Sequence, residues 1–510
     1  MIRVGIDVGG THTDAVLVEQ LSVCASVKTP TSADVTTGIA EALEQLLAQQ
    51  PQRREQITAV VIGTTHFTNA VIERHGLTPV AAIRIGLPAS RSLRPFVDWP
   101  PDLRDIVCGP IYEIKGGHEY DGRPIVELDE IGIRAAAQDI AARDISDVAI
   151  ASVFSPLNNA CERRAQHIVH EEHPRARITV SNELGRLGLL ERENATLLNA
   201  SIGPLARTTI QGFRDGLLQS GIDAPLYLTQ NDGTVMQSDQ AMRFPIFSFS
   251  SGPTNSMRGA AILSGVSDAI VIDVGGTTTD FGYLKDGFPR QANNVVEVGG
   301  VRTAFRMPDV VSIGLGGGSV VDLEQARVGP RSVGYELRSR AQIFGGAVLT
   351  ASDLAVYTGQ VELGDRRRIE TLNPHSVLLT LEVIKQQLEE QVDRMKSDAG
   401  DVAVIAVGGG DFLVPANLAG VSDVIRVEHG GVANAVGAAI AQVSGEVDQV
   451  FSHLSRQEAL TQATNLARQR AINAGANEQS LTVVDVEDLP VAYLPGDSRR
   501  VRVRVIGDAQ

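Results

Sequence analysis

The sequence predicts an α/β protein with two similar domains around a cleft and a small C-terminal region. Short apolar runs typical of buried strands alternate with longer helical patterns along most of the chain. A nearly identical segment occurs twice, far apart in the chain. The 510 residues also exceed the ~250–300 residues at which a single hydrophobic core stops growing. These observations favour two related domains over one large core.

The repeated segment is a glycine turn between two strand-like apolar runs. The first copy is Ile6–Asp14 and the second is Ile272–Asp280, and the copies differ only at His12 and Thr278. Repeats with a period of ~20–50 residues indicate a solenoid. Copies this far apart indicate instead that each belongs to one of two similar domains.

The other elements follow from the spacing of apolar residues. Continuous short apolar runs predict strands at Ile57–Gly63, Val148–Val153, Arg177–Val180 and Val402–Val407. Helical periodicity predicts helices at Thr68–Arg74, Asn159–His173, Leu197–Leu218, His375–Lys396 and Val432–Val443. The stretch Pro88–Tyr120 is rich in Pro and Gly and contains Trp99, so we expect an irregular surface excursion there.

The pattern weakens from Glu446, and Leu481–Val505 is expected to form short strands. We therefore expect one domain at residues 1–195, a second at 196–445, and a small appendage at 446–510.

Composition and charge exclude several functional classes. The 43% hydrophobic and 21% charged residues exclude a disordered or collagen-like chain. A net charge of −16 argues against a nucleic-acid or anionic-membrane partner. The three cysteines give no disulfide framework. Neither a signal peptide nor an apolar span of ~20 residues is evident. We expect a cytoplasmic protein.

The two glycine turns have the chemistry needed to bind phosphate. Without a Cβ atom, glycine lets a phosphate approach the backbone N–H groups closely, and threonine hydroxyls add donors. The candidate phosphate-binding residues are Gly9, Gly10, Thr11, Thr13, Gly275, Gly276, Thr277 and Thr278. One such turn alone would be an ordinary hairpin, whereas two facing copies can clamp a nucleotide phosphate chain.

Four aspartates accompany these turns: Asp7, Asp14, Asp273 and Asp280. Carboxylate oxygens suit Mg²⁺, which they hold directly or through its waters. We expect Asp7 and Asp273 to be the metal ligands, and Asp14 and Asp280 to position the turns or a water molecule. His12 lies inside the first turn, where it is a candidate for phosphate binding, proton transfer or substrate contact.

A third glycine turn, Gly408-Gly409-Gly410, follows a predicted strand and is expected to border the nucleoside. The chain has no Walker A motif, and Gly314–Ser319 matches the dinucleotide fingerprint only in part, because Ser319 replaces the third glycine.

The paired turns and the later triple glycine resemble the nucleotide fold of actin, heat-shock chaperones and sugar kinases, in which two actin-like (ribonuclease H-like) domains surround a nucleotide cleft. More narrowly, roughly residues 1–440 resemble the hydantoinase/oxoprolinase family, A-type subunit. The matching segments are Gly63-Thr-Thr65, Thr68-Asn-Ala70, Glu191-Arg192, Thr196, Asn199-Ala200, Ser250-Ser-Gly-Pro253, Ile272–Asp280, Ser312–Ser319, Val328-Gly-Pro330 and His429-Gly-Gly431.

The chain departs from that family in three respects. Family members usually have Phe at the position of His12 and His at the position of Ile62, whereas His66 here follows the threonines. The chain is also shorter than the common A-type subunit, so we expect Glu446–Gln510 to replace part of the usual C-terminal region.

The resemblance implies ATP and Mg²⁺ as cofactors and an ATP-dependent opening of a cyclic amide such as a hydantoin, oxoproline or lactam. The amide oxygen would be phosphorylated; carboxylation of a ketone is a related activation. It also implies a B-type or other partner subunit, and we expect an oligomer. An actin-like or chaperone-like ATPase switch acting on a protein partner, and a small-molecule kinase, share the same clamp and stay open as alternatives.

Several other motifs have a functional and an ordinary interpretation. His66, Ser251-Gly-Pro253 with Asn255, and His429 are candidates for substrate or nucleotide loops, or are simple turns. The histidines His167, His170 and His173 have the wrong spacing for a zinc motif and favour a solvated helix end. The run Arg366–Arg368 favours a charged loop, and Cys24, Cys108 and Cys161 lack a neighbouring base in the sequence.

Overall fold

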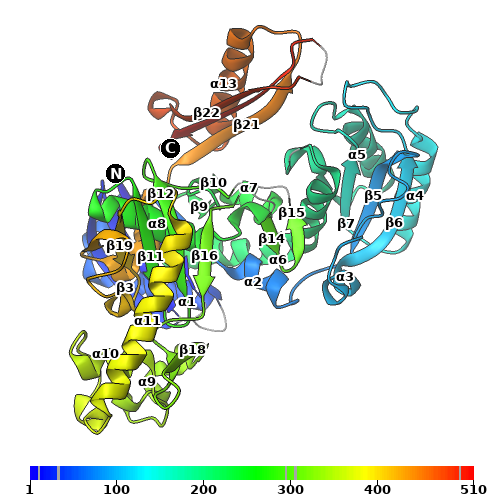
Figure 1. Ribbon diagram of the computed structural model, residues 1–510. Helices are drawn as coiled ribbons and strands as arrows, with labels where there is room; N and C mark the ends of the chain where they lie inside the picture. The colour runs from blue at the N-terminus through cyan, green and yellow to red at the C-terminus, as the bar shows by residue number, and fades with distance from the viewer. Residues whose placement is uncertain are drawn as a thin grey trace.

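The computed structural model describes residues 1–9, 12–30, 35–185, 187–292, 296–303, 307–492 and 496–509. Figure 1 shows two halves packed side by side, an inserted α/β unit next to the first half, and a C-terminal group of strands with one helix. The expected α/β class with two similar halves is confirmed by the arrangement of the sheets.

The sheet of the first half is assembled from both ends of the chain. Its order is β22-β23-β21-β10-β9-β4-β1-β2-β3. The strands are β1 (Ile2–Val8), β2 (His12–Glu19), β3 (Ser22–Pro30), β4 (Ile57–Thr64), β9 (Leu226–Thr229), β10 (Val235–Gln237), β21 (Val443–Phe451), β22 (Thr482–Pro490) and β23 (Arg499–Gly507). The C-terminal strands therefore continue the first sheet through β21, which pairs with β10.

The sheet of the second half has the order β13-β12-β11-β19-β20, and β16 also pairs with β12. Its strands are β11 (Ala269–Val274), β12 (Thr279–Lys285), β13 (Phe288–Pro289), β16 (Val310–Ile313), β19 (Val402–Val407) and β20 (Val421–Arg426). Two small hairpins belong to the same part of the sequence. The hairpin of β17 (Ser319–Asp322) and β18 (Arg327–Ser332) lies with the second half, whereas that of β14 (Val296–Val298) and β15 (Val301–Thr303) packs against α6 and the core of the first half.

The inserted unit is a parallel sheet in the order β6-β5-β7-β8. Its elements are β5 (Val80–Leu87), α3 (Pro101–Val107), β6 (Cys108–Lys115), α4 (Glu130–Ala142), β7 (Asp147–Ser152), α5 (Ala160–Glu172) and β8 (Arg177–Val180). The expectation of an irregular excursion at Pro88–Tyr120 was wrong, because α3 and β6 lie within it. Trp99 is buried there and donates a hydrogen bond from Nε1 to Asn194 Oδ1 at 2.8 Å.

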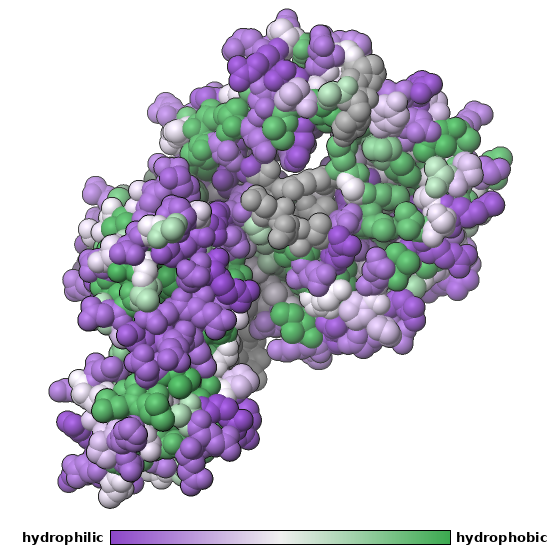
Figure 2. All heavy atoms as spheres, in the orientation of Figure 1, coloured by the Kyte–Doolittle hydropathy of each residue, from purple (hydrophilic) through white to green (hydrophobic). Residues whose placement is uncertain are grey.

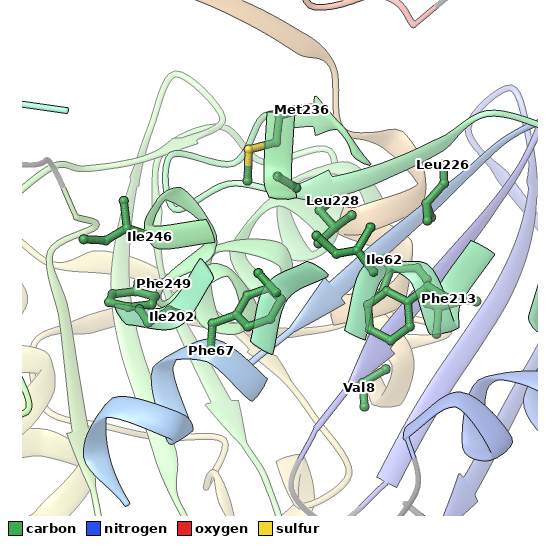
Figure 3. Close-up of a cluster of buried hydrophobic side chains, with 14 of the residues drawn as sticks. Val8, Ile62, Phe67, Ile202, Phe213, Leu226, Leu228, Met236, Ile246 and Phe249 are labelled. Atoms are coloured by element: carbon green, nitrogen blue, oxygen red, sulfur yellow. The ribbon is translucent and has the colours of Figure 1, made fainter. Parts of the chain in front are cut away.

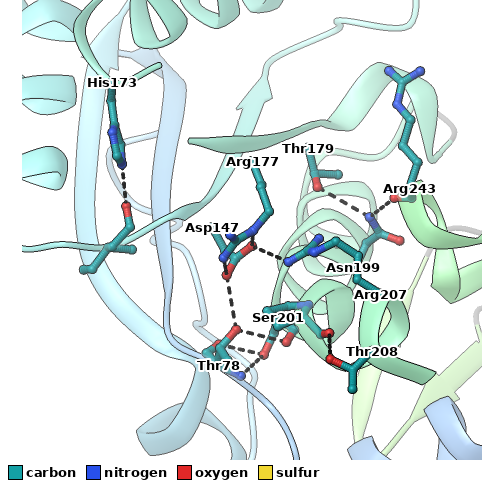
Figure 4. Close-up of polar contacts among 12 residues, drawn as sticks. Thr78, Asp147, His173, Arg177, Thr179, Asn199, Ser201, Arg207, Thr208 and Arg243 are labelled. Carbon is teal, nitrogen blue, oxygen red and sulfur yellow. Dashed lines mark hydrogen bonds and ion pairs between the residues drawn. The ribbon is translucent and has the colours of Figure 1, made fainter. Parts of the chain in front are cut away.

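Helix α6 (Leu189–Gln219) joins the inserted unit to the first half. The boundary expected between the first and second domains, after residue 195, lies inside this helix. Asp147 at the start of β7 forms ion pairs with Arg177 and Arg207, and Ser201 of α6 donates to the Thr78 carbonyl at 2.7 Å (Figure 4). These contacts fix the inserted sheet against α6.

The apolar core of the first half lies between its sheet and α6. Figure 3 shows Val8 of β1, Ile62 of β4, Leu228 of β9 and Phe213 of α6 converging on this core. Because Val8 is the last residue of β1 and Ile62 lies near the end of β4, the core holds those strand ends, and the turns that follow them, in a fixed position.

Two helices cross between the halves, α8 (Ser251–Ser264) and α12 (Ala433–Ile440). A Cβ atom on Gly259 would lie 1.9 Å from the Ala433 carbonyl oxygen, and one on Gly437 would lie 1.9 Å from the Asn255 carbonyl oxygen. The close crossing therefore requires glycine at both positions.

The remaining helices pack around these sheets and helices. They are α1 (Val35–Gln49), α2 (His66–Ile72), α7 (Ser238–Arg243), α9 (Leu337–Arg340), α10 (Ala351–Thr358), α11 (Pro374–Met395) and α13 (Arg456–Asn473). Figure 2 shows a surface covered mostly by hydrophilic side chains, with apolar ones in smaller groups. Within the described ranges, no helix has the length and apolar character needed to cross a membrane.

Candidate functional site

The two copies of the repeated segment form the same hairpin. Asp7 lies opposite Asp14 across β1 and β2, and Asp273 lies opposite Asp280 across β11 and β12. The Gly9 N–H donates to the His12 carbonyl at 3.0 Å, and the Gly275 N–H donates to the Thr278 carbonyl at 2.9 Å. The internal repeat in the sequence is thus a structural repeat, with a carboxylate on each strand beside a glycine turn.

In each half a glycine lies against the first aspartate. A Cβ atom on Gly63 of β4 would lie 2.6 Å from Asp7 Oδ1, and one on Gly408, which follows β19, would lie 2.3 Å from Asp273 Oδ1. The parallel neighbour of each hairpin therefore makes room for the carboxylate, which a larger residue would displace.

Asp7 is buried, with 5% of its surface exposed. Its Oδ2 accepts a hydrogen bond from Asn434 Nδ2 at 2.9 Å. Its Oδ1 has no hydrogen bond of acceptable geometry within the described residues, although the Asn255 amide lies nearby. Burial and, to a lesser extent, the charge of Asp14 raise the pKa of Asp7 to about 7, although hydrogen bonding to the Asn255 and Asn434 amides opposes the rise.

The carboxylates of the two halves lie close enough to influence one another. Burial raises the pKa of Asp273; the Ser256 hydrogen bond and the Lys28 charge oppose this, and the Asp14 charge adds to it. Burial raises the pKa of Asp280 to about 6, against a hydrogen bond from Ser312. The two hairpins border a common space, because Lys28 of the first half lies against both Asp14 and the Gly409 turn of the second half.

Lys28 of β3 lies in this space, and the sequence interpretation missed it. Its Nζ lies 2.7 and 2.8 Å from the two carboxylate oxygens of Asp14 and donates to the Gly431 carbonyl at 3.1 Å. Its Cε lies 4.0 Å from the position of a Cβ atom on Gly409 in the second half. The sequence shows a lysine on the strand that follows the first hairpin. Only the pairing register of β2 and β3, however, places this lysine opposite Asp14.

The glycine-rich segment at residues 314–318 supports the second turn. The Gly317 N–H donates to the Gly275 carbonyl at 3.0 Å, and the Gly318 N–H donates to the Gly276 carbonyl at 2.7 Å. A Cβ atom on Gly316 would lie 2.6 Å from the Thr277 nitrogen. This segment therefore packs beneath the second turn, which accounts for its partial match to a dinucleotide motif.

The third glycine turn borders the second hairpin. The Gly410 N–H donates to the Val274 carbonyl at 2.8 Å, and the Gly408 N–H donates to the Gly430 carbonyl at 3.0 Å. Gly409 is exposed between them. The structure thus brings Gly408, Gly409 and Gly410 next to Gly275 and Gly276.

The other predicted site residues lie around the first turn. Thr13 is buried, and the His12 side chain is exposed; desolvation and the nearby Lys28 lower the pKa of His12. His66 begins α2 and its N–H donates to Thr64 Oγ1 at 3.1 Å. Gly10 and Thr11 lie outside the described residues.

The aspartate side chains at this site suit a magnesium ion that is also bound by a phosphate. They suit a metal ion held by protein side chains alone less well. Within the described ranges, no group of three or more His, Cys, Asp or Glu side chains can hold a metal ion. Mg²⁺ is usually bound by one or two carboxylates together with phosphate oxygens and waters. Asp7 Oδ1, which has no hydrogen bond among the described residues, provides such a position, and the charge of Asp273 in the other half contributes to the raised pKa of Asp7.

The other motifs have structural roles. His173 is buried and its Nε2 forms a hydrogen bond with the Ile145 carbonyl at 3.0 Å, whereas His167 pairs with Glu171. Arg366 donates to the Tyr357 carbonyl, and Arg367 pairs with Asp365. The cysteines Cys24, Cys108 and Cys161 are free thiols.

Comparison with known proteins identifies related sequences and folds. Family models match at residues 3–173 (hydantoinase/oxoprolinase N-terminal region) and at residues 192–365 (hydantoinase/oxoprolinase). The chain is 26% identical to the caprolactamase subunit alpha of Pseudomonas jessenii, over 71% of this chain and 55% of that protein. It is 24% identical to the acetone carboxylase beta subunit of Xanthobacter autotrophicus, over 79% and 58%.

The structure of the ATP-dependent caprolactamase from Pseudomonas jessenii superposes with a TM-score of 0.81 at 19% identity, covering 100% of this chain and 88% of that chain. This likeness shows a shared fold. The chain spans about half the length of the relatives that it matches in sequence. Because both regions of one family are matched in order along most of its length, the chain belongs to the hydantoinase/oxoprolinase family.

Proposed function

We propose that this protein is an ATP-dependent enzyme, or a subunit of one, that opens a cyclic amide by phosphorylating the amide oxygen. The observation that carries the proposal is the pair of aspartate hairpins facing one space, each with a glycine turn able to approach a phosphate. The family and the caprolactamase relative support the cyclic amide as substrate.

In this proposal the two halves hold one nucleotide between them. Gly9, Gly10, Thr11 and Thr13 of the first turn and Gly275, Gly276, Thr277 and Thr278 of the second turn bind the phosphates. Gly408, Gly409 and Gly410 border the nucleoside. Asp14 and Asp280 position the turns, and His12 at the rim contacts phosphate or substrate.

Asp7 and Asp273 would hold Mg²⁺, which neutralises charge on the phosphates when it is bound. Lys28 adds a positive charge beside the first turn, where four carboxylates would otherwise repel an anionic nucleotide. The work of the protein in phosphoryl transfer is largely positioning and charge neutralisation, and these residues are placed for both.

Phosphorylation removes the main obstacle to amide hydrolysis. The amide nitrogen donates electrons into the carbonyl and makes the carbon a poor electrophile. Transfer of the γ-phosphoryl group forms a bond from the carbonyl oxygen to phosphorus and breaks the bond from phosphorus to the bridging oxygen, which leaves with ADP. Water then adds to the carbon and the amine departs, leaving an acyl phosphate that a second water cleaves at its carbon.

The same pair of glycine turns and aspartates is compatible with other functions. An acetone carboxylase subunit is also a relative, so activation of a ketone carbonyl is the second candidate. An ATPase switch or a small-molecule kinase has the same clamp but no specific observation in its favour. Both relatives are named as subunits, so we propose that this chain also works with a B-type or other partner and assembles into an oligomer.

An isotope experiment tests the phosphorylation step. The cyclic amide carries ¹⁸O in its ring carbonyl, and the protein turns it over with Mg·ATP, together with its partner subunit if one is required. The proposal predicts ¹⁸O in the released inorganic phosphate, because the phosphorylated oxygen leaves the carbon with phosphorus. Complete ring opening with unlabelled phosphate would contradict this route and favour ATP hydrolysis by solvent water.

A further inference from the structure

The end of β4 and the start of α8 meet beside Asp7. Ser251 Oγ donates to the Thr64 carbonyl at 3.5 Å, and the Ser250 N–H donates to Thr68 Oγ1 at 3.4 Å. A Cβ atom on Gly252 would lie 3.5 Å from Thr65 Cγ2. Two motifs that are far apart in the sequence, the Thr-Thr-His loop and the Ser-Gly-Pro turn, thus form one junction.

The first turn of α8 has backbone N–H groups at this junction for which the described part of the chain shows no acceptor. The helix has 14 residues, its N-cap Ser250 is in the left-handed region at φ 57°, and no side chain caps it. The N–H groups of Ser251 and Gly252 have no intrahelical acceptor, and no acidic residue lies in the first turn. Gly252 is partly exposed. These donors favour an oxygen atom that is anionic or becomes so.

An uncommitted acceptor, Asn255 Oδ1, belongs to the same helix one turn beyond these donors. Asn255, on the next turn of α8, is 1% exposed and donates from Nδ2 to Thr229 Oγ1 at 3.2 Å. This bond fixes the amide orientation and leaves Asn255 Oδ1 buried without a hydrogen bond among the described residues. Both Asn255 and Asp7 border Gly63, one residue before Thr64. The junction therefore adjoins the carboxylate assigned above to the nucleotide.

We propose that this junction is the acceptor subsite and that it takes a secondary cyclic amide. The substrate carbonyl oxygen accepts hydrogen bonds from the Ser251 and Gly252 N–H groups, and its ring N–H donates to Asn255 Oδ1. A ketone has no N–H, so the subsite selects amides over ketones. This inference rests on the proposed function and specifies where its substrate binds.

The test uses Gly252→Val, which fills the junction beside Thr65, with Ser264→Val at the opposite end of α8 as the matched control. The assays are Mg·ATP binding by fluorescence titration and ATP hydrolysis with caprolactam, hydantoin, 5-oxoproline or acetone. Gly252→Val should raise the KM for the stimulating amide at least about 10-fold while the Kd for Mg·ATP stays within about 2-fold. Ser264→Val should change neither, and acetone should not stimulate.

An unchanged amide KM in Gly252→Val, an equal loss of Mg·ATP affinity, or stimulation by acetone alone would overturn the assignment. A crystal structure with Mg·ADP and aluminium fluoride gives a second test that needs no acceptor. The apical oxygen should lie within hydrogen-bond distance of the Ser251 or Gly252 N–H, and an apical oxygen directed elsewhere would overturn the assignment. Failure of the wild-type protein to bind Mg·ATP would instead contradict the proposed function itself.

Discussion

The two aspartate hairpins have the same backbone but different partners on the adjoining strand. In the first half, Lys28 of β3 lies opposite Asp14 and forms an ion pair with it at 2.7 Å. In the second half, Ser312 of β16 lies opposite Asp280 and its hydroxyl donates to that carboxylate. A cation neutralises one copy, and a neutral hydroxyl supports the other.

Because of this difference, the two hairpins differ in charge. The first turn has a lysine beside it, whereas in the second the pKa of Asp280 is raised to about 6 by burial without a cation to offset it. The duplicated hairpin thus gives each half a similar glycine turn, while the adjoining strand decides whether the second aspartate has a cationic or a neutral partner. The predictions below test whether the two copies contribute equally.

The largest effect is expected from removing the carboxylate at the end of β11. Asp273→Ala should lower Mg-dependent ATP turnover more than about 100-fold, because a proposed ligand of the Mg²⁺ that neutralises the phosphates is lost. Steady-state ATPase assays measure this, with circular dichroism to verify that the variant is folded. Turnover at the wild-type rate in the folded variant would remove Asp273 from the site.

The glycines beneath the two aspartates should differ in their sensitivity. In Gly408→Ala, the new Cβ atom would lie 2.4 Å from the Val274 carbonyl oxygen, at a φ of 89°. In Gly63→Ala the close atoms are side-chain ends, 2.4 Å at Asn255 Nδ2 and 2.6 Å at Asp7 Oδ1. We expect at least about a 10-fold loss of ATPase activity in both variants. The loss should be larger in Gly408→Ala, because a backbone carbonyl cannot move aside as easily as the end of a side chain.

Gly400→Ala, on an exposed bend, is the control for these variants. Equal activity of Gly408→Ala and Gly400→Ala would show that Asp273 does not need the space that Gly408 leaves.

Replacement of the lysine tests the asymmetry directly. Lys28→Met leaves Asp14, whose side chain is 4% exposed, without its cation. We expect a loss of about 1–2 kcal/mol in the free energy of unfolding, between the values for exposed and buried pairs, and about a 10-fold weaker affinity for Mg·ATP. Urea denaturation and nucleotide titration measure the two effects.

The double variant Lys28→Met with Asp14→Asn separates them. It should recover stability, because no unpaired charge stays buried, but it should not recover affinity. Recovery of both would show that Lys28 only compensates Asp14.

A further prediction concerns the pH dependence of stability. Asp7, with a folded-state pKa of about 7, binds a proton more tightly in the folded chain than in the unfolded one. Its protonation therefore stabilises the fold at low pH, and that contribution is lost as pH rises from about 4 to about 7. Between about pH 5.5 and about pH 7.5 the loss from Asp7 is about 2 kcal/mol.

Asp7→Asn should remove this slope, as measured by urea denaturation across the pH range without nucleotide. ATPase activity should change in the direction opposite to stability and rise with pH over the same range, because only the deprotonated carboxylate of Asp7 can bind a metal ion. A variant with the wild-type slope would show that Asp7 does not titrate in this range.

Local signals predicted much of the fold. The strands at Arg177–Val180 and Val402–Val407 were predicted with the bounds that the structure has, and the second of them is a continuous apolar run. The repeated hairpins were predicted from their identical residues. The stretch Pro88–Tyr120 was misread because Pro and Gly outweighed the weak pattern of β6, whose strand is stabilised by pairing with β5.

The sequence predicted the site residues only where they lie together in one short segment of the chain. The Asp-Gly-Gly-Thr turns are local, so their residues could be named from the sequence. Lys28, Asn255 and Asn434 reach the same aspartates from other strands and helices, and their positions depend on register and on the crossing of α8 and α12. No local pattern encodes those distances.

The central claim is that both hairpins bind one nucleotide, and calorimetric titration of Mg·ATP into the wild-type, Asp7→Asn and Asp273→Asn proteins tests it most directly. We predict one nucleotide per chain for the wild type, no binding without Mg²⁺, and at least about a 10-fold weaker affinity in each variant. Unchanged affinity in either folded variant, or two nucleotides per chain, would contradict a single nucleotide clamped between the halves.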